Sequence, residues 1–576
     1  MESSRPSPLR APGSVRSRLL EVLSEQELLP EASITTYRDR LEEPLERILI
    51  DQALVSPMLI QSLLEEIAGI PATPIPLQVS EKFLAAIPSH AIIDYQVLPV
   101  ENEDDDILTL VADQVHSVNT EDDLRLIIGR SIRWQWCAPD ILRKSIRHYY
   151  GIGLEAFAGR GLELEDSDTD GPDIQGLVHA IIEEAVSSNA TDIHFEPRES
   201  GMQLRFRIDG ALNRAPLPAG AENYARAIVS SIKAMAQLNV AERRLPQDGR
   251  FDHTLDGETF DLRVSILPYA HGEAANLRIL NRQSSFLNLD ELGFDVDQRA
   301  NVDSLLSLSH GMILFTGPTG SGKTSSLYAS AEQLNDPERK IITLEDPIEY
   351  EIPGINQMQV HPEIGFTFAA GLRAMLRHDP DVVLIGEIRD SETASIAVSA
   401  ALTGHLVFSS LHTNNAVSAI PRLIDMGVEP YLVASSLEGI IAQRLIRCLC
   451  PTCREPGEVD ERLLSEIHMA APQCPKNPVL YRAAGCPECL FTGYRGRKAI
   501  YEILLMDDAL RALTVEHSSS EQLQRTAREQ GLKTLRESGW ACALEGLTSV
   551  NEVLRVTQRP SSREQGRQTL FDFNKK

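Results

Sequence analysis

The chain has 576 residues, and its 55 Lys and Arg against 83 Asp and Glu leave a formal net charge of −28. This length predicts three or four domains. The acidic balance disfavours nucleic acid as the main partner, although a small basic channel would be compatible with it. No apolar run reaches the roughly 18 residues of a membrane span, and the start lacks the apolar core of a secretory signal. We therefore expect a soluble protein of the cell interior.

Two segments precede the first clear linker. Residues 1–66 have a helical pattern, in which Ser56 and Pro57 are residue types that begin a helix. Residues 67–161 are expected to form an α+β domain. Its strands are predicted from apolar runs at 92–98, 107–111 and 132–136. Neither segment gathers catalytic residue types, so we predict a helical module followed by an adaptor domain rather than an active site.

Residues 162–173 are acidic, nearly without apolar side chains and interrupted by Gly-Pro, which is typical of a flexible linker. The segment that follows, 174–300, predicts a second α+β domain that begins with an amphipathic helix. Arg263 and Arg278 lie on two predicted strands in which apolar and polar residues alternate, so both should project from one sheet face. A solvated charged face is the default interpretation of such a pattern.

A glycine-rich motif in the segment 301–447 organises the rest of the chain. Its sequence G-x-x-x-x-G-K-T follows the apolar run Met312–Phe315 and precedes a helical pattern, the context of a phosphate-binding P-loop. The glycines let backbone N–H groups turn toward phosphates, Lys323 reaches the β and γ oxygens, and Thr324 offers a hydroxyl to Mg²⁺. An incidental surface turn is the alternative. The predicted nucleotide-binding residues are Gly317, Pro318, Thr319, Gly320, Ser321, Gly322, Lys323 and Thr324.

Two further buried strands, 340–344 and 382–385, deliver carboxylates to the same edge of a parallel sheet. Glu349 and Glu387 are the candidates for orienting or deprotonating a water molecule and for holding Mg²⁺. Acids at strand-to-helix turns also cap helices, which is the alternative interpretation. Gly386 stands where many P-loop enzymes have an Asp that helps to hold the metal.

Two histidines flank a fourth predicted strand, 406–409. A lone His is more often structural than catalytic. A pair, His405 and His412, at the ends of a strand in the same sheet would suit a sensor of the γ-phosphate or of Mg²⁺. We therefore include both among the candidate catalytic residues.

Four of the eight cysteines form two C-x-x-C pairs in the segment 448–500. Each pair can supply two thiolates to a tetrahedral zinc ion, and four sulfurs would close a structural site. Redox chemistry is the alternative, but the surrounding fold that it needs is not indicated. The predicted zinc ligands are Cys450, Cys453, Cys486 and Cys489, with Cys448 and Cys474 as spare thiols. Residues 501–558 are predicted to form a helical subdomain and 559–576 a disordered tail.

Together the motifs resemble those of the ATPases that drive type II secretion and type IV pilus assembly. The resemblance lies in four segments in family order: Gly317–Thr324, Leu344–Tyr350, Arg377–Asp390 and Gly404–Thr413. In that family these are the Walker A motif, the aspartate box, an atypical Walker B motif, in which Gly386 is normal, and the histidine box. The likeness extends from about residue 190 to about residue 557.

The resemblance implies an α/β fold in which a PAS-like α+β domain precedes a RecA-like P-loop ATPase core. A small zinc-binding module follows the core, and an N-terminal α+β adaptor domain comes first. It also implies a homohexamer that uses ATP, Mg²⁺ and Zn²⁺. Arg263 and Arg278 match positions from which the family's PAS-like domain reaches toward nucleotide, and a guanidinium group suits charge that develops on a transferring phosphoryl group.

The implied function is a motor that hydrolyses ATP to assemble a secretion pseudopilus or a pilus. It would be cytoplasmic and peripheral at the inner membrane, held there by a platform protein and by the cytoplasmic domain of a bitopic membrane protein. No nucleic acid is expected as a partner. A DNA-uptake or conjugation-type ATPase and a catalytically weak ring scaffold are the alternatives.

Two features refine this implied function. The family's retraction ATPases generally lack the cysteine module, which favours an assembly motor. The cyclic di-GMP motif of some relatives is matched only loosely, at residues 45–55, so a protein-docking role is favoured for the N-terminal region.

Overall fold

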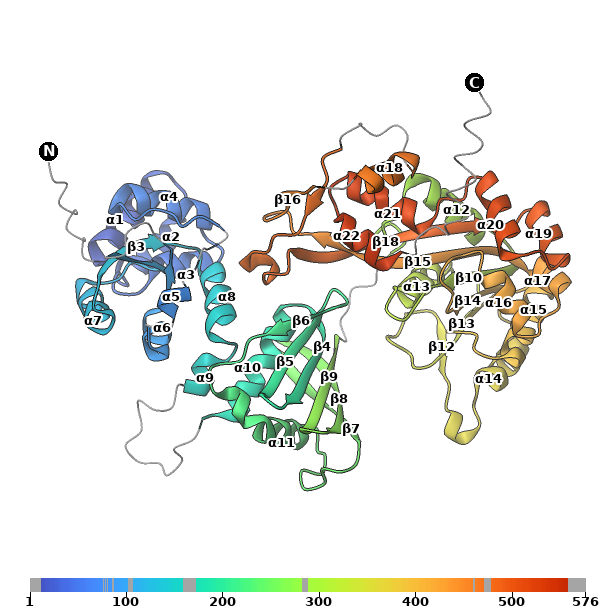
Figure 1. The fold of residues 1–576 in the computed structure, drawn as a ribbon, viewed down its shortest axis with the longest axis horizontal. Coiled ribbons are helices and arrows are strands. Elements are labelled where there is room, and N and C mark those ends of the chain that lie inside the picture. Colours follow the sequence, from blue (N-terminus) through green and yellow to red (C-terminus); the bar gives the residue numbers. More distant parts are fainter. Residues whose placement is uncertain are drawn as a thin grey trace. The chain divides into compact units, whose positions relative to one another are not determined.

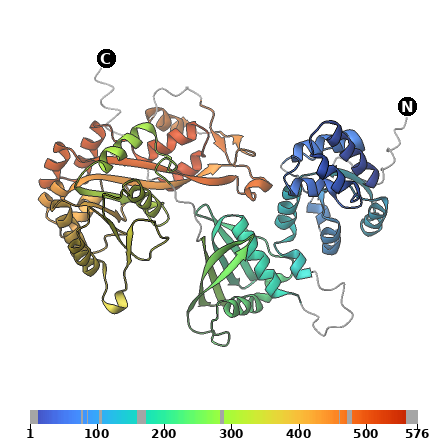
Figure 2. The same ribbon diagram turned by 180° about the vertical axis from the view of Figure 1, so that it is seen from behind.

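Figures 1 and 2 show the chain as a computed structural model, which forms two compact units. It describes residues 12–75, 77, 79, 81–84, 87–101, 107–158, 172–281, 288–458, 461–470 and 478–557. The first unit takes in the described residues up to 281 together with 484–493, and the second takes in the rest. Within these ranges, no helix combines the length and apolar character that crossing a membrane requires. The predicted linker and tail lie outside the described residues, apart from Pro172 and Asp173.

The first unit begins with helices packed on a small mixed sheet. The helices are α1 (Pro12–Glu25), α2 (Glu31–Arg38), α3 (Leu45–Asp51), α4 (Pro57–Ala68), α5 (Glu81–Leu84), α6 (Ser89–Tyr95), α7 (Val118–Ile128), α8 (Pro139–Tyr150) and α9 (Leu154–Ala158), and the strands are β1 (Val97–Val100), β2 (Ile107–Ala112) and β3 (Ser131–Trp136). Trp136 shares a buried cluster with Leu19 of α1. Arg16 and Glu46 form a buried ion pair, and both side chains also bond the backbone of Val115. The predicted helical segment and adaptor domain therefore share one core.

One predicted strand is wrong in its first half. Residues 92–95 belong to α6, which begins after Pro88 and ends at Gln96 in a left-handed conformation with a φ of 49°. Ala91 and Ile92 are fully buried. A short apolar run fits a buried helix as well as a buried strand, so its periodicity does not separate the two.

The rest of the first unit is a six-stranded antiparallel sheet with two helices against one face (Figures 1 and 2). Its elements are α10 (Ile174–Ser187), β4 (Ala190–Arg198), β5 (Gly201–Ile208), β6 (Ala211–Ala215), η1 (Ala221–Tyr224), α11 (Ala225–Met235), β7 (Gln247–Leu255), β8 (Glu258–Tyr269) and β9 (Gly272–Asn281). The strand order is β6-β5-β4-β9-β8-β7. Leu262 and Leu277 are buried in the core with these helices. Because side chains alternate along a strand, Arg263 and Arg278 project from the opposite face.

A seven-stranded sheet forms the centre of the second unit, in the order β12-β11-β13-β14-β10-β15-β18. All neighbouring strands are parallel except β15 and β18. The elements are β10 (Gly311–Thr316), α13 (Lys323–Gln333), β11 (Ile341–Glu345), β12 (Asn356–Gln359), η2 (Pro362–Ile364), α14 (Phe368–Met375), η3 (Leu376–His378), β13 (Val382–Ile385), α15 (Ser391–Leu402), β14 (Leu406–Leu411), α16 (Ala419–Asp425), α17 (Pro430–Ser436), β15 (Leu437–Leu449) and β18 (Tyr494–Leu505). The four strands predicted from apolar runs in this region are confirmed as β10, β11, β13 and β14.

Both faces of this sheet are covered. Met312 and Leu314 of β10 belong to one buried cluster, whereas Ile313 and Phe315 belong to another. Successive side chains of a strand point to opposite faces, so each must be apolar when helices cover both sides. This burial explains the uninterrupted apolar runs in the sequence.

Two predicted domain boundaries fall inside regular elements. The boundary at residue 300 lies within α12 (Val296–Leu306), where Asp295 and Gln298 form a capping box and Val302 and Leu305 enter a core of the second unit. The boundary at residue 500 lies within β18. The remaining elements are β16 (Glu455–Pro456), α18 (Glu461–Ala470), β17 (Tyr481–Arg482), η4 (Pro487–Cys489), α19 (Asp508–Val515), α20 (Ser520–Glu529), α21 (Leu535–Leu544) and α22 (Val550–Val556).

Candidate nucleotide-binding site and cysteine cluster

The P-loop connects β10 to α13 and packs against β15. A Cβ atom at Gly317 would lie 2.5 Å from Ser321 Oγ and 2.7 Å from the carbonyl oxygen of Gln443. At Gly322 it would lie 2.7 Å from Gln443 Nε2, and the φ of 88° there is left-handed. Both positions therefore require glycine, which lets the loop close tightly over the end of the sheet.

Lys323 is the first residue of α13, and its ammonium group lies inside the P-loop. Nζ donates hydrogen bonds to the carbonyl oxygens of Gly317 (2.8 Å) and Pro318 (3.0 Å). Burial lowers the pKa of Lys323 to about 8, and the neighbouring Glu387 partly opposes this shift. Ser321 Oγ is buried and has no hydrogen-bond partner among the described residues. A phosphate group would supply acceptors to both side chains.

The other predicted nucleotide-binding residues are exposed. They are Pro318, Thr319, Gly320 and Thr324. They lie at the N-terminus of an eleven-residue helix, where N–H groups and the helix dipole favour an anion. The loop therefore fits the phosphates of a nucleotide, and the role of Thr324 toward Mg²⁺ stays a prediction.

Four neighbouring parallel strands end at the edge where the P-loop lies. β10 leads into the P-loop, β11 ends at Glu345, β13 leads to Glu387 and β14 leads to His412. The strands are adjacent in the order β11-β13-β14-β10. Ligands of open parallel sheets bind at the carboxyl ends of the strands, so this edge is the candidate active site.

The structure brings together Glu387 and His412. His412 Nε2 lies 3.3 Å from Glu387 Oε2, while Glu387 Oε1 forms an ion pair with Arg389. Glu387 follows β13, which only β14 separates from β10 and its P-loop, and its negative charge opposes the lowering of the Lys323 pKa. A carboxylate that contacts an imidazole at the edge where the P-loop lies can orient and deprotonate a water molecule.

His405 lies at the other end of β14. Its Nδ1 is 3.0 Å from the carbonyl oxygen of Ala400, at the C-terminal end of α15. β14 has six residues, so about 20 Å of strand separates the two histidines. His405 therefore lies far from the sheet edge that carries Glu387 and His412, and its catalytic role stays a prediction.

Glu349 lies on the loop between β11 and β12 and is exposed. Its backbone N–H donates a hydrogen bond to the hydroxyl oxygen of Tyr328 at 3.3 Å. Within the described part of the chain, no hydrogen bond or ion pair holds its carboxylate. The Glu349 carboxylate is therefore free of described partners, and its role toward a metal ion or water stays a prediction.

Two buried charged residues near His412 were not predicted from the sequence. Arg444 of β15 donates from Nη2 to the carbonyl oxygen of Asn414 at 2.7 Å, and Glu502 of β18 accepts from the N–H of Ala416 at 2.8 Å. Burial raises the pKa of Glu502 and lowers that of Arg444. Together they hold the loop that follows His412. A charged residue within an apolar strand is the sequence signal that could have identified them.

Arg263 and Arg278 belong to the first unit, where they lie directly opposite each other on β8 and β9. Both are exposed. Arg278 Nε donates to Oδ1 of the buried Asp192 at 3.1 Å, whereas no described residue forms a hydrogen bond or ion pair with Arg263. The P-loop belongs to the second unit, so the role of these arginines at the nucleotide stays a prediction.

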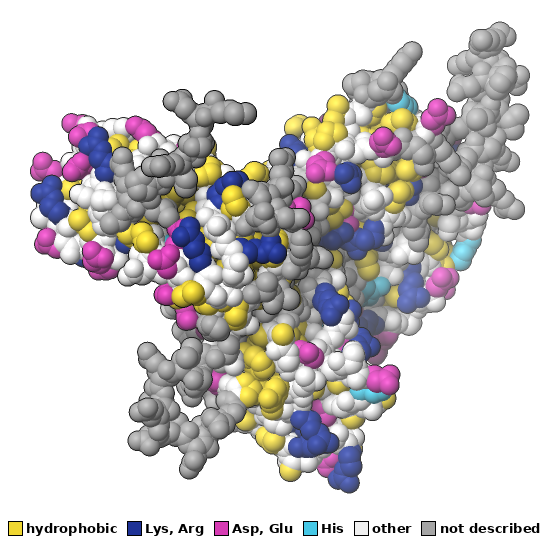
Figure 3. Space-filling view, turned by 60° about the vertical axis from the view of Figure 1, so that its left-hand side comes forward, with side chains coloured by type: hydrophobic (Ala, Val, Ile, Leu, Met, Phe, Trp, Pro, Cys, Tyr) yellow, Lys and Arg dark blue, Asp and Glu magenta, His cyan; other side chains and the backbone are white. Residues whose placement is uncertain are grey.

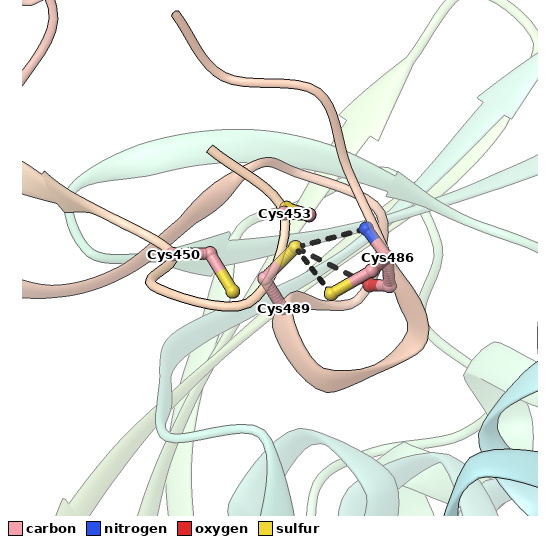
Figure 4. Close-up of side chains that lie close together, drawn as sticks. All are labelled: Cys450, Cys453, Cys486 and Cys489. Carbon is pink, nitrogen blue, oxygen red and sulfur yellow. Dashed lines mark hydrogen bonds between the residues drawn. The ribbon is translucent and has the colours of Figure 1, made fainter. Parts of the chain in front are cut away.

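The four predicted metal ligands converge (Figure 4). All four cysteines are buried, and their Sγ atoms lie within 4.8 Å of one another. The Sγ atoms of Cys486 and Cys489 are 3.8 Å apart, which matches the separation of about 3.8 Å that two thiolates 2.3 Å from a tetrahedral zinc ion would have. Cys489 Sγ also accepts hydrogen bonds of 3.2 Å from the N–H groups of Cys486 and Gly493. Four buried sulfurs that converge in this way fit a tetrahedral zinc ion.

A family model described as "Type II/IV secretion system protein" matches residues 166–555. The chain belongs to this family. A second model, described as "MshEN domain", matches residues 48–156. The second match spans the predicted boundary at residue 66, in agreement with the shared core of the N-terminal helices and β3.

Three relatives of the family illustrate the similarity. Type II secretion system protein E of Pseudomonas aeruginosa is 50% identical over 412 residues, which are 71% of this chain and 80% of that protein. Type II secretion system ATPase E of Vibrio cholerae is 47% identical over 398 residues, which are 69% and 77% of the two chains. Type IV pilus assembly ATPase PilB of Thermus thermophilus is 41% identical over 477 residues, which are 80% of this chain and 53% of that protein.

Membership of the family confirms the resemblance that the motifs indicated. It also confirms the α/β class with a RecA-like P-loop core, and an ATPase that uses ATP and Mg²⁺. The cysteine cluster supports the predicted zinc module.

Removing zinc should loosen the cysteine module. We expect about one zinc ion per subunit, because four thiolates close one tetrahedral site. Replacing Cys453 with Ser should remove the metal and lower the unfolding temperature, whereas Cys448→Ser, next to the cluster in sequence, should retain the metal. Elemental analysis of protein purified without chelators measures the metal content. Zinc-free wild type, or loss of zinc in Cys448→Ser, would contradict this ligand set; Cys474 lies outside the described residues.

Proposed function

We propose that the chain is the subunit of a homohexameric motor that hydrolyses ATP to assemble a type II secretion pseudopilus or a type IV pilus. The observation that carries this proposal is the placement of Lys323, Glu387 and His412 at one sheet edge, where His412 Nε2 lies 3.3 Å from Glu387 Oε2. Relatives named for type II secretion and for pilus assembly, at 50% and 41% identity, support the cellular role.

In the proposed reaction the P-loop and Lys323 bind the β- and γ-phosphates. Thr324 and Glu349 would hold Mg²⁺, which would supply positive charge to offset that of the phosphoryl oxygens. Glu387 orients and deprotonates the attacking water, and His412 senses the γ-phosphate through its contact with Glu387. Arg263 and Arg278 are proposed to neutralise charge on the transferring group, and Asp192 orients Arg278.

The proposed location is the cytoplasmic side of the inner membrane, reached through protein partners. A platform protein and the cytoplasmic domain of a bitopic membrane protein are the proposed partners, because the relatives are named for secretion and pilus systems. The N-terminal region is proposed to supply the docking surface for the bitopic protein.

Two other functions remain to be tested against this proposal. A DNA motor would need a basic path, yet the net charge is −28 and Figure 3 shows basic and acidic side chains interspersed on the face drawn. A catalytically weak scaffold would not need Lys323 and Glu387. ATP turnover is to be measured alone, with DNA and with the detergent-solubilised platform protein. Stimulation by the platform protein alone supports the proposal; stimulation by DNA alone, or no turnover at all, contradicts it.

Truncation should separate docking from catalysis. A protein that begins at Gly171 retains the P-loop, the carboxylates, the histidines and both arginines, so it should hydrolyse ATP at a rate close to that of the full chain. It should no longer bind the membrane complex, because the N-terminal helices and the sheet β1–β3 have been removed. Co-purification with the solubilised partners measures this loss. A folded, hexameric truncated protein that binds them normally would refute the adaptor role.

A further inference from the structure

A buried carboxylate lies beside the loop that carries Glu349. Glu345, the last residue of β11, is 3% exposed. Its Oε1 accepts hydrogen bonds from Thr343 Oγ1 (2.5 Å) and Gln357 Nε2 (3.1 Å), and its Oε2 accepts one from the Tyr328 hydroxyl. A carboxylate is tolerated in a protein interior only when donors surround it. These three side chains therefore fix its position.

The Tyr328 hydroxyl has a second contact, on the loop itself. Its oxygen accepts the hydrogen bond from the backbone N–H of Glu349. Burial and the hydrogen bond to Glu345 raise the pKa of Tyr328 well above its usual value. The hydroxyl therefore keeps its proton, donates a hydrogen bond to the Glu345 carboxylate and accepts one from the backbone N–H of Glu349.

These contacts join α13, the helix that follows the P-loop, to the loop between β11 and β12 that carries Glu349. Tyr328 lies on α13, five residues after Lys323, and is 2% exposed. Gln357, which donates to Glu345, also donates to the carbonyl oxygen of Tyr350 at 3.1 Å. Core packing would account for an aromatic ring at position 328, but a phenylalanine would pack as well. The two hydrogen bonds of the hydroxyl need a separate explanation.

We propose that Tyr328 is a positioning residue for Glu349, whose loop it fixes relative to the P-loop through a hydroxyl anchored on Glu345. This inference rests on the proposed hydrolysis of ATP. The P-loop sets the place of the phosphates, and α13 is the rigid element that begins there. A hydroxyl on this helix therefore fixes the backbone of Glu349 relative to the P-loop. Its loss should affect the chemical step more than nucleotide binding.

Tyr328→Phe tests the role of the hydroxyl in the full-length hexamer. A catalytic group displaced by about 1 Å can lose about 100-fold in rate, so we expect kcat to fall by about 10- to 100-fold. The KM for ATP and the affinity for a non-hydrolysable ATP analogue should change by less than about twofold. Glu345→Gln, which keeps the volume but removes the charged anchor, should show the same division between kcat and KM.

Ser330→Ala is the matched control. Ser330 is a buried residue on the same helix, and within the described part of the chain its hydroxyl bonds only locally, to the carbonyl oxygen of Ser326 at 2.8 Å. Its removal should leave kcat unchanged. Unfolding temperature and hexamer size are compared across all variants, so that a loss of kcat in folded rings is read as a loss of positioning.

The decisive measurement combines Tyr328→Phe with Glu349→Gln under single-turnover conditions. If Tyr328 acts through Glu349, the double variant is no slower than Glu349→Gln alone. Two losses that multiply would overturn the inference, and so would a Tyr328→Phe variant with the kcat of Ser330→Ala. A wild type that does not hydrolyse ATP would overturn the proposed function, and that result is visible before any variant is made.

Discussion

Replacing Lys323 with Ala is expected to abolish ATP hydrolysis while the subunit keeps its fold. Among the described residues, the ammonium group bonds only to P-loop carbonyl oxygens, so its loss removes no contact of the apolar core. In the proposed reaction the same charge neutralises the phosphate oxygens. Removing a preorganised charge-stabilising group of this kind costs about 10³-fold or more in kcat. Phosphate release measures the rate, and thermal unfolding measures the fold.

Two comparisons make this result specific. Lys533→Ala removes the same charge from an exposed site with ion pairs to Asp295 and Asp297, and it should retain wild-type turnover. Glu387→Gln should bind ATP normally but turn over about 10²- to 10⁴-fold more slowly, because its amide cannot accept a proton from water. Substantial turnover by purified Lys323→Ala protein would remove the motor function.

The sheet edge that carries the P-loop could be predicted well from the sequence, because the patterns that indicate it are local. The P-loop motif lies within eight residues, and burial on both faces makes β10, β11, β13 and β14 continuous apolar runs. The ends of these strands then locate Glu387 and His412. The separation of His405 from them also follows from strand geometry, since two residues that flank one strand lie at opposite sheet edges.

Contacts between distant segments could not be predicted in this way. The hold of Arg444 and Glu502 on the loop after His412 depends on the pairing of β15 with β18, which are joined by more than forty residues. The bond of Tyr328 to Glu345 depends on how α13 is rotated over the sheet. Residues 92–95 form a helix, which the sequence did not indicate because a short apolar run suits a helix and a strand equally. Each of these features is set by tertiary packing, which a local pattern does not encode.

Replacing Arg263 with Ala is also expected to abolish ATP hydrolysis. Rings that contain both Arg263→Ala and Lys323→Ala subunits should recover part of the activity. Ring motors commonly complete a site with an arginine from a neighbour, and such a group is worth about 10³- to 10⁵-fold in GTPases. If Arg263 serves the neighbour's nucleotide, rings that mix Lys323→Ala with Arg263→Ala contain interfaces where an intact lysine meets an intact arginine. At equal amounts and random order, about one interface in four has this composition in a cyclic ring.

The experiment co-assembles the two variants over a range of ratios and verifies subunit mixing independently. Arg226→Ala is the matched control, because Arg226 is an exposed arginine of the same domain that lies on α11 rather than on β8. It should be active on its own, which shows that the loss of one positive charge does not silence the ring. Activity that peaks at intermediate ratios supports a site shared between subunits.

Baseline activity in verified mixed rings has two possible causes, which a titration of Lys323→Ala into wild type separates. If each subunit hydrolyses ATP independently, activity in the titration falls in proportion to the wild-type fraction. Baseline activity in rings of Lys323→Ala and Arg263→Ala then means that Arg263 serves the nucleotide of its own subunit. If one inactive subunit stops the whole ring, activity falls far more steeply than the wild-type fraction. Single-turnover hydrolysis in the mixed rings is then measured in place of the steady-state rate. Arg263 has no partner among the described residues whereas Arg278 is held by Asp192, so we expect Arg263→Ala to complement fully and Asp192→Ala to weaken the site only partly.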